Sequence, residues 1–338
     1  MRALVTGGAG FIGSHLVERL LDLGHEVCVI DDLSTGRLDN LNTIQHHCAF
    51  RLHLGSIHND GLLAELVFDT DVIFHLAAAV GLHTILENPV ASIQTNVAGT
   101  DRLLRLAAEA KKRVLITSTI EVYGKSRPHP LKETDNLALG PSINTRWSYA
   151  CGKAMNEFAA LAYHRERKLP VTIVRLCNTI GRKQVGKYGM VLPSFISQAV
   201  HGEPVTVFGS GEQSRCFVAV QDVVEGMLRC VSSDRAVGEI FNIGTTESTT
   251  INQLARKVIT ATNSLSTIVH VSYSTAYKDG FEDIDHLIPD IAKARRLVGY
   301  EPSLSLDDVI QDLVRSNRPT VARRVPHNES LLRSIQAL

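Results

Sequence analysis

The sequence predicts an α/β protein with a doubly wound parallel sheet and a smaller mixed α/β lobe. Apolar strands alternate with helical segments over the first 176 residues, which is the pattern of a parallel sheet covered by helices. The 338 residues are enough for two lobes. Hydrophobic residues make up 44% of the chain and charged residues 21%, as in ordinary globular proteins.

The individual elements follow from the spacing of apolar residues. We expect strands at residues 3–6, 26–30, 48–54, 71–79, 113–118 and 170–176. We expect helices from the first glycine-rich turn to about residue 23, and at residues 59–68, 89–112 and 148–168. The helix at 89–112 carries apolar residues at helical spacing, among them Ile93, Val97 and Leu104.

The chain opens with a strand, a glycine-rich turn, a helix and a second strand. Gly7 permits a tight turn, Gly10 lets a pyrophosphate approach the backbone, and Gly13 lets the helix pack close to the strand. Phe11 and Ile12 follow in the first helical turn, whose unpaired N–H groups and positive dipole end suit phosphate. This unit predicts a dinucleotide-binding site.

Asp31 stands at the end of the second strand, roughly 20 residues after the glycines. A carboxylate at this place can accept hydrogen bonds from both hydroxyls of a ribose. Because it would repel a 2′-phosphate, Asp31 favours NAD over NADP. We therefore expect NAD as the cofactor.

These patterns divide the chain. Residues 1–180 are predicted to form an NAD-binding Rossmann domain, which the chain rejoins at about residues 215–244. Residues 181–214 and 245–315 are predicted to form the second lobe, because the regular alternation of strands and helices weakens there. Residues 316–338 are expected to be a loosely held C-terminal tail.

A second group of residues predicts proton transfer. Thr119 follows a buried strand, so it lies at the edge where open α/β sheets bind ligands. Tyr149 and Lys153 are four residues apart and share one face of a helix. A nearby ammonium lowers the pKa of a phenol, so Tyr149 can act as a base toward a sugar hydroxyl while Thr119 shares the proton.

Charge and cysteine usage exclude other classes. The formal net charge is zero and no basic stripe is present, so we expect no nucleic-acid partner. No apolar run approaches the roughly 20 residues that span a bilayer, so we expect no membrane partner. Six scattered cysteines, and a first strand that begins directly after Met1, predict a cytoplasmic protein. His46 and His47 lack a third ligand at a plausible spacing, so no metal is expected.

With these motifs, the chain resembles the extended short-chain dehydrogenase/reductase family, specifically its nucleotide-sugar branch, over roughly residues 1–315. Besides the glycine turn and the Tyr149/Lys153 pair, the motifs that carry the resemblance are Phe74-His75-Leu76-Ala77-Ala78, Thr95-Asn96, Arg175-Leu176-Cys177-Asn178, Gly202-Glu203-Pro204 and residues 208–215. The resemblance implies a tightly held NAD and a UDP- or dTDP-sugar in the second lobe. A homodimer formed through paired long helices is typical of the family.

The resemblance also implies further site residues. Around the cofactor these are Ser56, Ile57, Leu76, Ala77, Ala78, Asn96 and Thr117. Around the sugar nucleotide they are Glu121, Asn178, Val191, Val207, Phe208 and Arg215. Arg215 would pair with the negative groups of the substrate.

Three positions depart from the family pattern. Ser56 stands where an Asp is usual near the adenine. Arg182-Lys183 replaces Pro-Arg. His286-Leu287 stands where an Arg usually grips the diphosphate, so the group that replaces this Arg is left open.

The residues after Thr119 discriminate within the branch. The 4,6-dehydratases have Asp-Glu there, and Ile120 takes the place of the acid that protonates a leaving hydroxyl. The 4-epimerases usually have small residues, whereas Glu121 is present here. The UDP-glucuronate decarboxylases have Thr-Ser-Glu-Val-Tyr-Gly, which the chain matches except at Ile120, and Arg-Trp-Ser-Tyr at 146–149 also resembles the bacterial decarboxylases.

The implied reaction is decarboxylation of UDP-glucuronate. Tyr149 would take the proton of the C4 hydroxyl while NAD oxidises C4. The resulting ketone is β to the C6 carboxylate, so carbon dioxide can leave, and Glu121 would help to protonate C5. Return of hydride would give UDP-xylose, and early release would give the UDP-4-keto-pentose.

Other interpretations stay open. A UDP-hexuronate or UDP-hexose 4-epimerase would keep the carboxylate and return hydride to the opposite face. A 4,6-dehydratase is less favoured because of Ile120. A catalytically silent NAD-binding regulator is disfavoured because Tyr149, Lys153 and Thr119 are all present.

Overall fold

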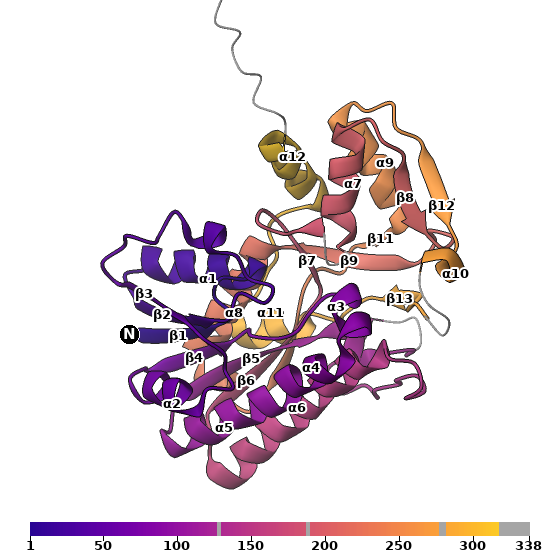
Figure 1. Ribbon diagram of the computed structural model, residues 1–338. Helices are drawn as coiled ribbons and strands as arrows, with labels where there is room; N and C mark the ends of the chain where they lie inside the picture. The colour runs from indigo at the N-terminus through magenta and orange to yellow at the C-terminus, as the bar shows by residue number, and fades with distance from the viewer. Residues whose placement is uncertain (127–129, 187–189, 277–281, 318–338) are drawn as a thin grey trace, which may run out of the picture.

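The main sheet is parallel and has seven strands, in the order β10-β6-β5-β4-β1-β2-β3. The computed structural model describes residues 1–126, 130–186, 190–276 and 282–317 (Figure 1). The strands of this sheet are β1 (Arg2–Thr6), β2 (Glu26–Asp31), β3 (Phe50–Leu54), β4 (Val72–His75), β5 (Arg113–Thr119), β6 (Val171–Leu176) and β10 (Ile240–Ile243). The predicted doubly wound α/β class is therefore confirmed.

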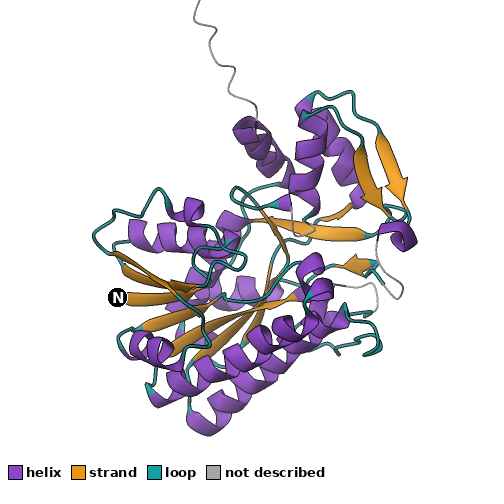
Figure 2. Ribbon diagram, in the orientation of Figure 1, coloured by secondary structure: helices purple, strands orange, loops and turns teal. Residues whose placement is uncertain are grey.

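Helices cover both faces of the main sheet (Figure 2). On one face, α1 (Phe11–Asp22) and α8 (Val220–Ser232) pack together. On the other face lie α2 (Asp60–Phe68), α5 (Gly99–Glu109) and α6 (Trp147–Arg167). Successive side chains of β1 point to opposite faces of the sheet: Ala3 and Val5 pack in the core with α1 and α8, and Leu4 packs in the core with α2 and α5.

The second lobe has its own sheets and core. Strand β9 (Ser214–Ala219) pairs with β7 (Asn178–Ile180), β11 (Ser248–Thr250) and β13 (His286–Leu287), while β8 (Val205–Phe208) pairs with β12 (Ile268–Val271). Three helices share a core with these strands: α7 (Val191–Val200), α9 (Ile251–Thr262) and α12 (Leu306–Asn317). Helix α11 (Ala292–Val298) instead contacts β10 and α8 of the main sheet.

Several predicted boundaries need correction. The strand expected at 71–79 ends at His75, where loop residues that line the site begin. The helix expected at 89–112 is divided into α4 (Pro89–Ile93), a π-helical turn (Gln94–Ala98) and α5. The segment expected to rejoin the main sheet at 215–244 does so through α8 and β10, whereas β9 belongs to the second lobe. Most of the expected C-terminal tail, from residue 318, lies outside the described residues.

The remaining short helices are α3 (Leu82–Glu87) and α10 (Tyr273–Ala276). Within the described parts of the chain, we find no helix with the length and apolar character needed to cross a bilayer.

His75, at the end of β4, is a buried polar link between the sheet and the helical layer. Its Nδ1 lies 2.8 Å from Thr6 Oγ1 and its Nε2 lies 3.0 Å from Thr100 Oγ1. Burial, reinforced by the nearby Lys153 charge, lowers the pKa of His75 to about 3. The folded protein therefore keeps this ring neutral.

This burial predicts a loss of stability in acid. Because the folded-state pKa of about 3 lies below the ordinary value of 6.5, the unfolded chain binds the proton more readily, so stability falls as the pH drops below 6.5. Between pH 6.5 and 5.5, the free energy of unfolding should fall by about 1 kcal/mol more in the wild type than in His75→Gln. Urea unfolding at both pH values measures this, and equal losses in the two proteins would contradict the assignment.

Candidate active site

A cavity of about 550 Å³ lies between the main sheet and the second lobe. On the sheet side it is lined by residues at or just beyond the carboxyl ends of strands, including Gly7 after β1, Asp31 at the end of β2 and Leu76 after β4. On the other side it is lined by residues such as Phe208 and Arg215. The cavity therefore occupies the position where open α/β sheets bind ligands.

The glycine turn brings β1 and α1 close together. Gly7 has a φ of +73°, and a Cβ at this position would lie 2.8 Å from the backbone N of Ala77. A Cβ at Gly13 would lie 2.2 Å from the carbonyl oxygen of Gly7. Both positions therefore exclude a larger residue. Gly10 is the N-cap of α1 and has no side chain that could cap the helix. The first turn of α1 lines the cavity, so its uncapped N–H groups can serve a ligand there.

Asp31 is held by the same turn. Its Oδ2 accepts a hydrogen bond from Ala9 N at 2.9 Å, and its Oδ1 accepts one from Leu33 N at 2.8 Å. Burial raises the pKa of Asp31, although both backbone bonds oppose this shift. A side chain at Gly36 would meet Oδ1 at 2.8 Å, so glycine keeps the approach to the carboxylate open.

The pair predicted to transfer protons, Tyr149 and Lys153, lies on α6 beside the end of β5. Lys153 Nζ donates to the carbonyl oxygen of Thr117 at 2.9 Å, and burial lowers the pKa of Lys153 to about 8. Burial raises the pKa of Tyr149, and the negative charge of Glu121 raises it further. The pKa of Tyr149 is thus raised and not lowered as predicted, because desolvation is the larger effect and the Lys153 ammonium is bonded to Thr117.

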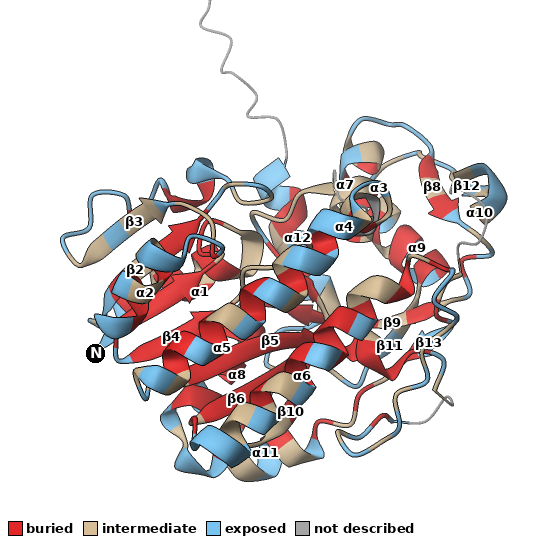
Figure 3. Cartoon of the chain, turned by 60° about the horizontal axis from the view of Figure 1, so that its bottom comes forward, coloured by how far each residue is buried: buried red, intermediate tan, exposed pale blue. Residues whose placement is uncertain are grey.

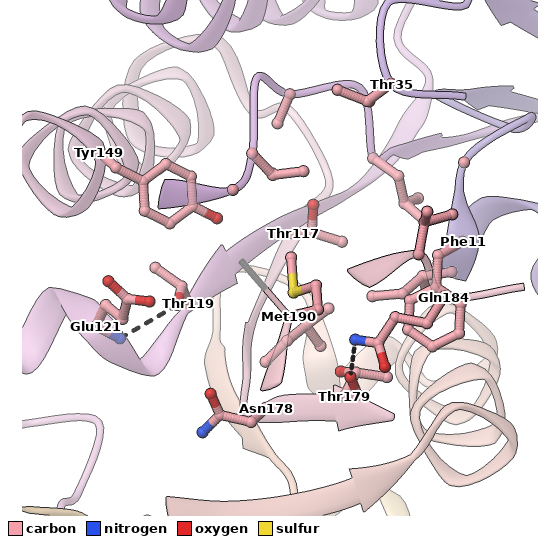
Figure 4. A pocket seen from close by; sticks show the side chains of 18 of the residues that line it. Phe11, Thr35, Thr117, Thr119, Glu121, Tyr149, Asn178, Thr179, Gln184 and Met190 are labelled. Atoms are coloured by element: carbon pink, nitrogen blue, oxygen red, sulfur yellow. Dashed lines mark hydrogen bonds between the residues drawn. The ribbon is translucent and has the colours of Figure 1, made fainter. Parts of the chain in front are cut away.

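Thr119 and Glu121 lie at the end of β5, on the same side of the cavity as Tyr149 (Figure 4). Thr119 Oγ1 accepts a hydrogen bond from Glu121 N at 3.2 Å and so caps the 3₁₀ turn Ile120–Tyr123. The Glu121 side chain keeps 34% exposure, whereas Ile120 is buried in the core. The structure thus brings Thr119, Glu121 and Tyr149 together and places no carboxylate at position 120.

A buried ion pair fixes α6 to the sheet below these residues. Arg175 on β6 binds Glu157 on α6 through two bonds, Nε–Oε1 of 2.9 Å and Nη2–Oε2 of 2.7 Å. Ser118 also donates to Glu157, at 2.5 Å. Both charged side chains are almost fully buried, so each charge would be costly to bury without the other. Arg175, which belongs to a motif of the resemblance, is therefore a structural residue here.

Arg215 lines the cavity but is already paired with a carboxylate. Its Nη2 lies 2.7 Å from Asp283 Oδ1, and its Nη1 donates to the carbonyl oxygen of Ser214 at 2.8 Å. Tyr273 donates to the other oxygen of Asp283 at 2.8 Å. The expected bidentate contact with a substrate anion would have to form beside this existing ion pair.

Most of the predicted site residues line the cavity. On the cofactor side these are Gly7, Gly10, Phe11, Ile12, Gly13, Asp31, Ile57, Leu76, Ala77, Ala78, Thr117, Tyr149 and Lys153. On the substrate side they are Thr119, Glu121, Asn178, Val191, Phe208 and Arg215.

Three predicted residues do not line the cavity. The side chain of Ser56 instead accepts a hydrogen bond from His58 N at 3.3 Å. Asn96 is buried and bonds both backbone groups of Ala79, so it shapes a loop rather than a surface. Val207 is fully buried in the core of the second lobe, because alternation along β8 sends Thr206 and Phe208 to the cavity instead.

Sequence reasoning missed several cavity residues. Arg146 and Asp283 bring opposite charges, and Lys183, Gln184 and Met190 come from the loop before α7. The available signal for Arg146 was the resemblance of residues 146–149 to the bacterial decarboxylases. At the two departures near residue 286, His286 Nδ1 lies 2.8 Å from Ser214 Oγ, and Leu287 is buried. Within the described residues, no cluster of three or more His, Cys, Asp or Glu side chains is arranged to hold a metal.

The chain is similar to known enzymes that act on nucleotide sugars. A family model described as GDP-mannose 4,6 dehydratase matches residues 4–313. A UDP-N-acetyl-alpha-D-glucosaminuronate decarboxylase of Bacillus cytotoxicus is 38% identical, with 93% of this chain and 97% of that protein covered. UDP-glucuronic acid decarboxylase 2 of Arabidopsis thaliana is also 38% identical, with 95% of this chain and 69% of that protein covered.

A solved structure is similar over almost the whole chain. It is the UDP-glucuronic acid 4-epimerase of Bacillus cereus in complex with UDP-glucuronic acid and NAD, which is 27% identical with a TM-score of 0.84. The match covers 94% of this chain and 99% of that one. The chain therefore belongs to the GDP-mannose 4,6 dehydratase family, which confirms its resemblance to the nucleotide-sugar enzymes of short-chain dehydrogenase/reductase type.

Proposed function

We propose that this chain is an NAD-dependent decarboxylase of a UDP-linked hexuronic acid, with UDP-glucuronate as the substrate and UDP-xylose or the UDP-4-keto-pentose as the product. The observation that carries this proposal is the grouping of Tyr149, Thr119 and Glu121 at one wall of the cavity, beside an apolar Ile120. Relatives named as UDP-uronate decarboxylases support it.

The residues around the first half of the cavity fit NAD. The glycines at positions 7 and 13 keep the turn free of side chains for a pyrophosphate at the start of α1, and Asp31 presents its carboxylate to the cavity at the end of β2, where a ribose is expected. When bound, NAD supplies the acceptor and donor of a hydride. A similar structure crystallised with NAD supports this assignment.

The chain's own residues would move the protons. Tyr149 would accept the proton of the C4 hydroxyl, and Thr119, on the same side of the cavity, would share that hydrogen bond. Lys153 would hold its charge close to Tyr149 while bonded to Thr117. A pKa that burial lowers to about 8 keeps Lys153 mostly protonated at neutral pH, so its charge can favour the ionised phenol.

The loss of carbon dioxide needs little from the protein. Once C4 is a ketone, the C6 carboxylate is β to it, and its electrons can flow into an enolate. No acid is needed for a leaving hydroxyl, which is consistent with Ile120. Glu121, with a third of its side chain exposed, would take up a proton from solvent and pass it to C5 of the enolate, directly or through a water, which supplies the one proton that the loss of carbon dioxide consumes. Asn178, Val191, Phe208 and Arg215 would hold the nucleotide diphosphate.

Two findings support a second substrate and a second reaction as alternatives to test. A relative that covers nearly the full chain is named for a substrate with an N-acetyl group, so UDP-N-acetylglucosaminuronate is the second substrate to test. A similar structure is a UDP-glucuronic acid 4-epimerase, which supports 4-epimerisation as the alternative reaction.

The proposed function predicts loss of one carbon dioxide from UDP-glucuronate. Purified full-length protein is incubated in parallel with UDP-glucuronate, UDP-N-acetylglucosaminuronate and UDP-glucose, and the sugar nucleotides are analysed by mass spectrometry. Tyr149→Phe should lower the rate by about 10²- to 10⁴-fold because the base is lost. An isomer of unchanged mass, identified by NMR, would show a 4-epimerase and overturn the decarboxylase assignment.

Another prediction concerns NAD. Asp31→Asn puts an amide N–H₂ against a backbone donor and removes the charge, so the affinity for NAD should fall by about tenfold or more. Since burial raises the pKa of Asp31, the wild-type affinity should also fall on acidification, beginning at a higher pH than for an ordinary Asp, and this dependence should disappear in the variant. Calorimetric titration measures both effects, with Asp22→Asn on the exposed end of α1 as control. Unchanged affinity in Asp31→Asn would exclude the ribose contact.

We also propose that the protein is a cytoplasmic homodimer. Four large apolar side chains are exposed side by side on α4 and α6: Val90 (68%), Ile93 (47%), Met155 (52%) and Phe158 (65%). This face of the helical layer is seen in Figure 3. Exposed apolar side chains gathered on two neighbouring helices are typical of a contact with another protein surface, and a second copy presents the same patch. The six free thiols are consistent with a reducing compartment.

A further prediction tests this surface. Phe158→Asp places a charge in the centre of the patch, so it should convert a dimer to a monomer at micromolar concentration. Light scattering after size-exclusion chromatography measures the mass. Phe68→Asp, at the end of α2, where the side chain is 55% exposed, is the matched control and should leave the mass unchanged. A dimer that survives Phe158→Asp would place the contact elsewhere.

A further inference from the structure

Arg146 is a charged residue of the cavity for which neither the sequence nor the proposed reaction supplies a role. It is the N-cap of α6, three residues before Tyr149. Its side chain is only 10% exposed, and it lines the cavity. A guanidinium this deeply buried needs carboxylates nearby to offset its desolvation.

Two carboxylates from distant parts of the chain meet this guanidinium. Arg146 Nη1 lies 3.4 Å from Glu121 Oε2, and Nη2 lies 3.4 Å from Asp283 Oδ1. The guanidinium carbon also lies 5.4 Å from the ring centroid of Trp147, within range of a cation–π contact. Since Asp283 binds Arg215 as well, Arg146 connects the end of β5 to the substrate side of the cavity.

The position of Glu121 raises an electrostatic problem for catalysis. Its negative charge disfavours ionisation of Tyr149, the residue that has to accept a proton. The charged groups that face this corner are Glu121 from the 3₁₀ turn, Lys153 from α6, Arg146 at the N-cap of α6, Asp283 from the segment before β13 and Arg215 from β9. Of these, Arg146 is the cation that contacts Glu121 directly.

We propose that Arg146 is a positioning residue that fixes the Glu121 carboxylate and offsets its charge, so that Tyr149 can take a proton beside it. Asp283 holds the other edge of the guanidinium and fixes its orientation. As a role in catalysis, this inference rests on the proposed function, because it takes Tyr149 as the base. As an arrangement of charges, it rests on the contacts alone.

A kinetic double-mutant cycle tests the role. The variants are Arg146→Met, Glu121→Gln and the double variant, and the signal is the absorbance of reduced NAD when the holoenzyme is mixed with UDP-glucuronate. This oxidation step precedes the protonation of C5 that is proposed for Glu121, so it can be followed in Glu121→Gln as well. At neutral pH, Arg146→Met should slow the step about tenfold and move its pH dependence upward, whereas in the Glu121→Gln background the same change should cost less than about twofold.

Three further results separate this role from others. Arg146→Lys, which keeps a charge, should recover part of the rate. Lys257→Met, which removes an exposed partner of Asp307 on the second lobe, should change nothing in this assay. The proposal is overturned if Arg146→Met slows both backgrounds equally, or if it raises KM and leaves kcat unchanged, because Arg146 would then act on the substrate itself.

A stability cycle with the same variants needs no turnover. If Arg146 holds Glu121, urea unfolding should show that Arg146→Met lowers the midpoint by more in the wild type than in Glu121→Gln. Equal losses would overturn the arrangement. If no UDP-uronate is converted by the wild type while the stability coupling is present, the proposed function fails and the placement of Arg146 against Glu121 stands.

Discussion

The parallel direction of the main sheet is the constraint on which the candidate site depends. Because all seven strands run the same way, the residues that follow β1, β2, β4 and β5 emerge at one edge. Gly7, Asp31 and Thr119 are separated by long stretches of chain, and only this common edge brings them to one cavity. The second lobe is built from segments that leave the same edge, so the chain itself closes the other side.

Buried charge, rather than apolar packing alone, fixes the parts of the site relative to one another. The Arg175–Glu157 pair joins β6 to α6, the helix that carries Tyr149 and Lys153. The Lys153 ammonium is anchored to the end of β5 through Thr117. Each of these groups is costly to bury unless its partner is in place, so loss of the fold's geometry at this junction would leave charges uncompensated. Helix α6 is therefore held against β5 and β6 by buried polar contacts that would be left without partners if the helix shifted.

The chemistry proposed for the cavity depends on which charges surround the reacting sugar. Position 120 presents an apolar side chain, so the corner lacks an acid for a leaving hydroxyl. Glu121 is the proposed relay of a solvent proton to C5, and in its ionised form its charge opposes the ionisation of Tyr149. Arg146 contacts both Glu121 and Asp283, and Asp283 also binds Arg215. This cluster would let one cavity hold a carboxylate near the proposed base, Tyr149, and a cation near the anionic groups of the proposed substrate.

The sequence by itself determined the sheet class, the glycine turn, Asp31 and the Tyr149/Lys153 pair. These features are local: each depends on spacing within one strand, turn or helix, so a pattern over a few residues predicts it. Only the tertiary structure decided that Val207 points into the core of the second lobe and that Asn96 binds the loop at Ala79. It also decided that Arg215 forms an ion pair with Asp283. It likewise decided the pKa of Tyr149, because desolvation and the neighbouring Glu121 outweigh the lysine that the spacing had singled out. Burial and contacts between distant segments set these properties, and neither can be seen in the order of the residues.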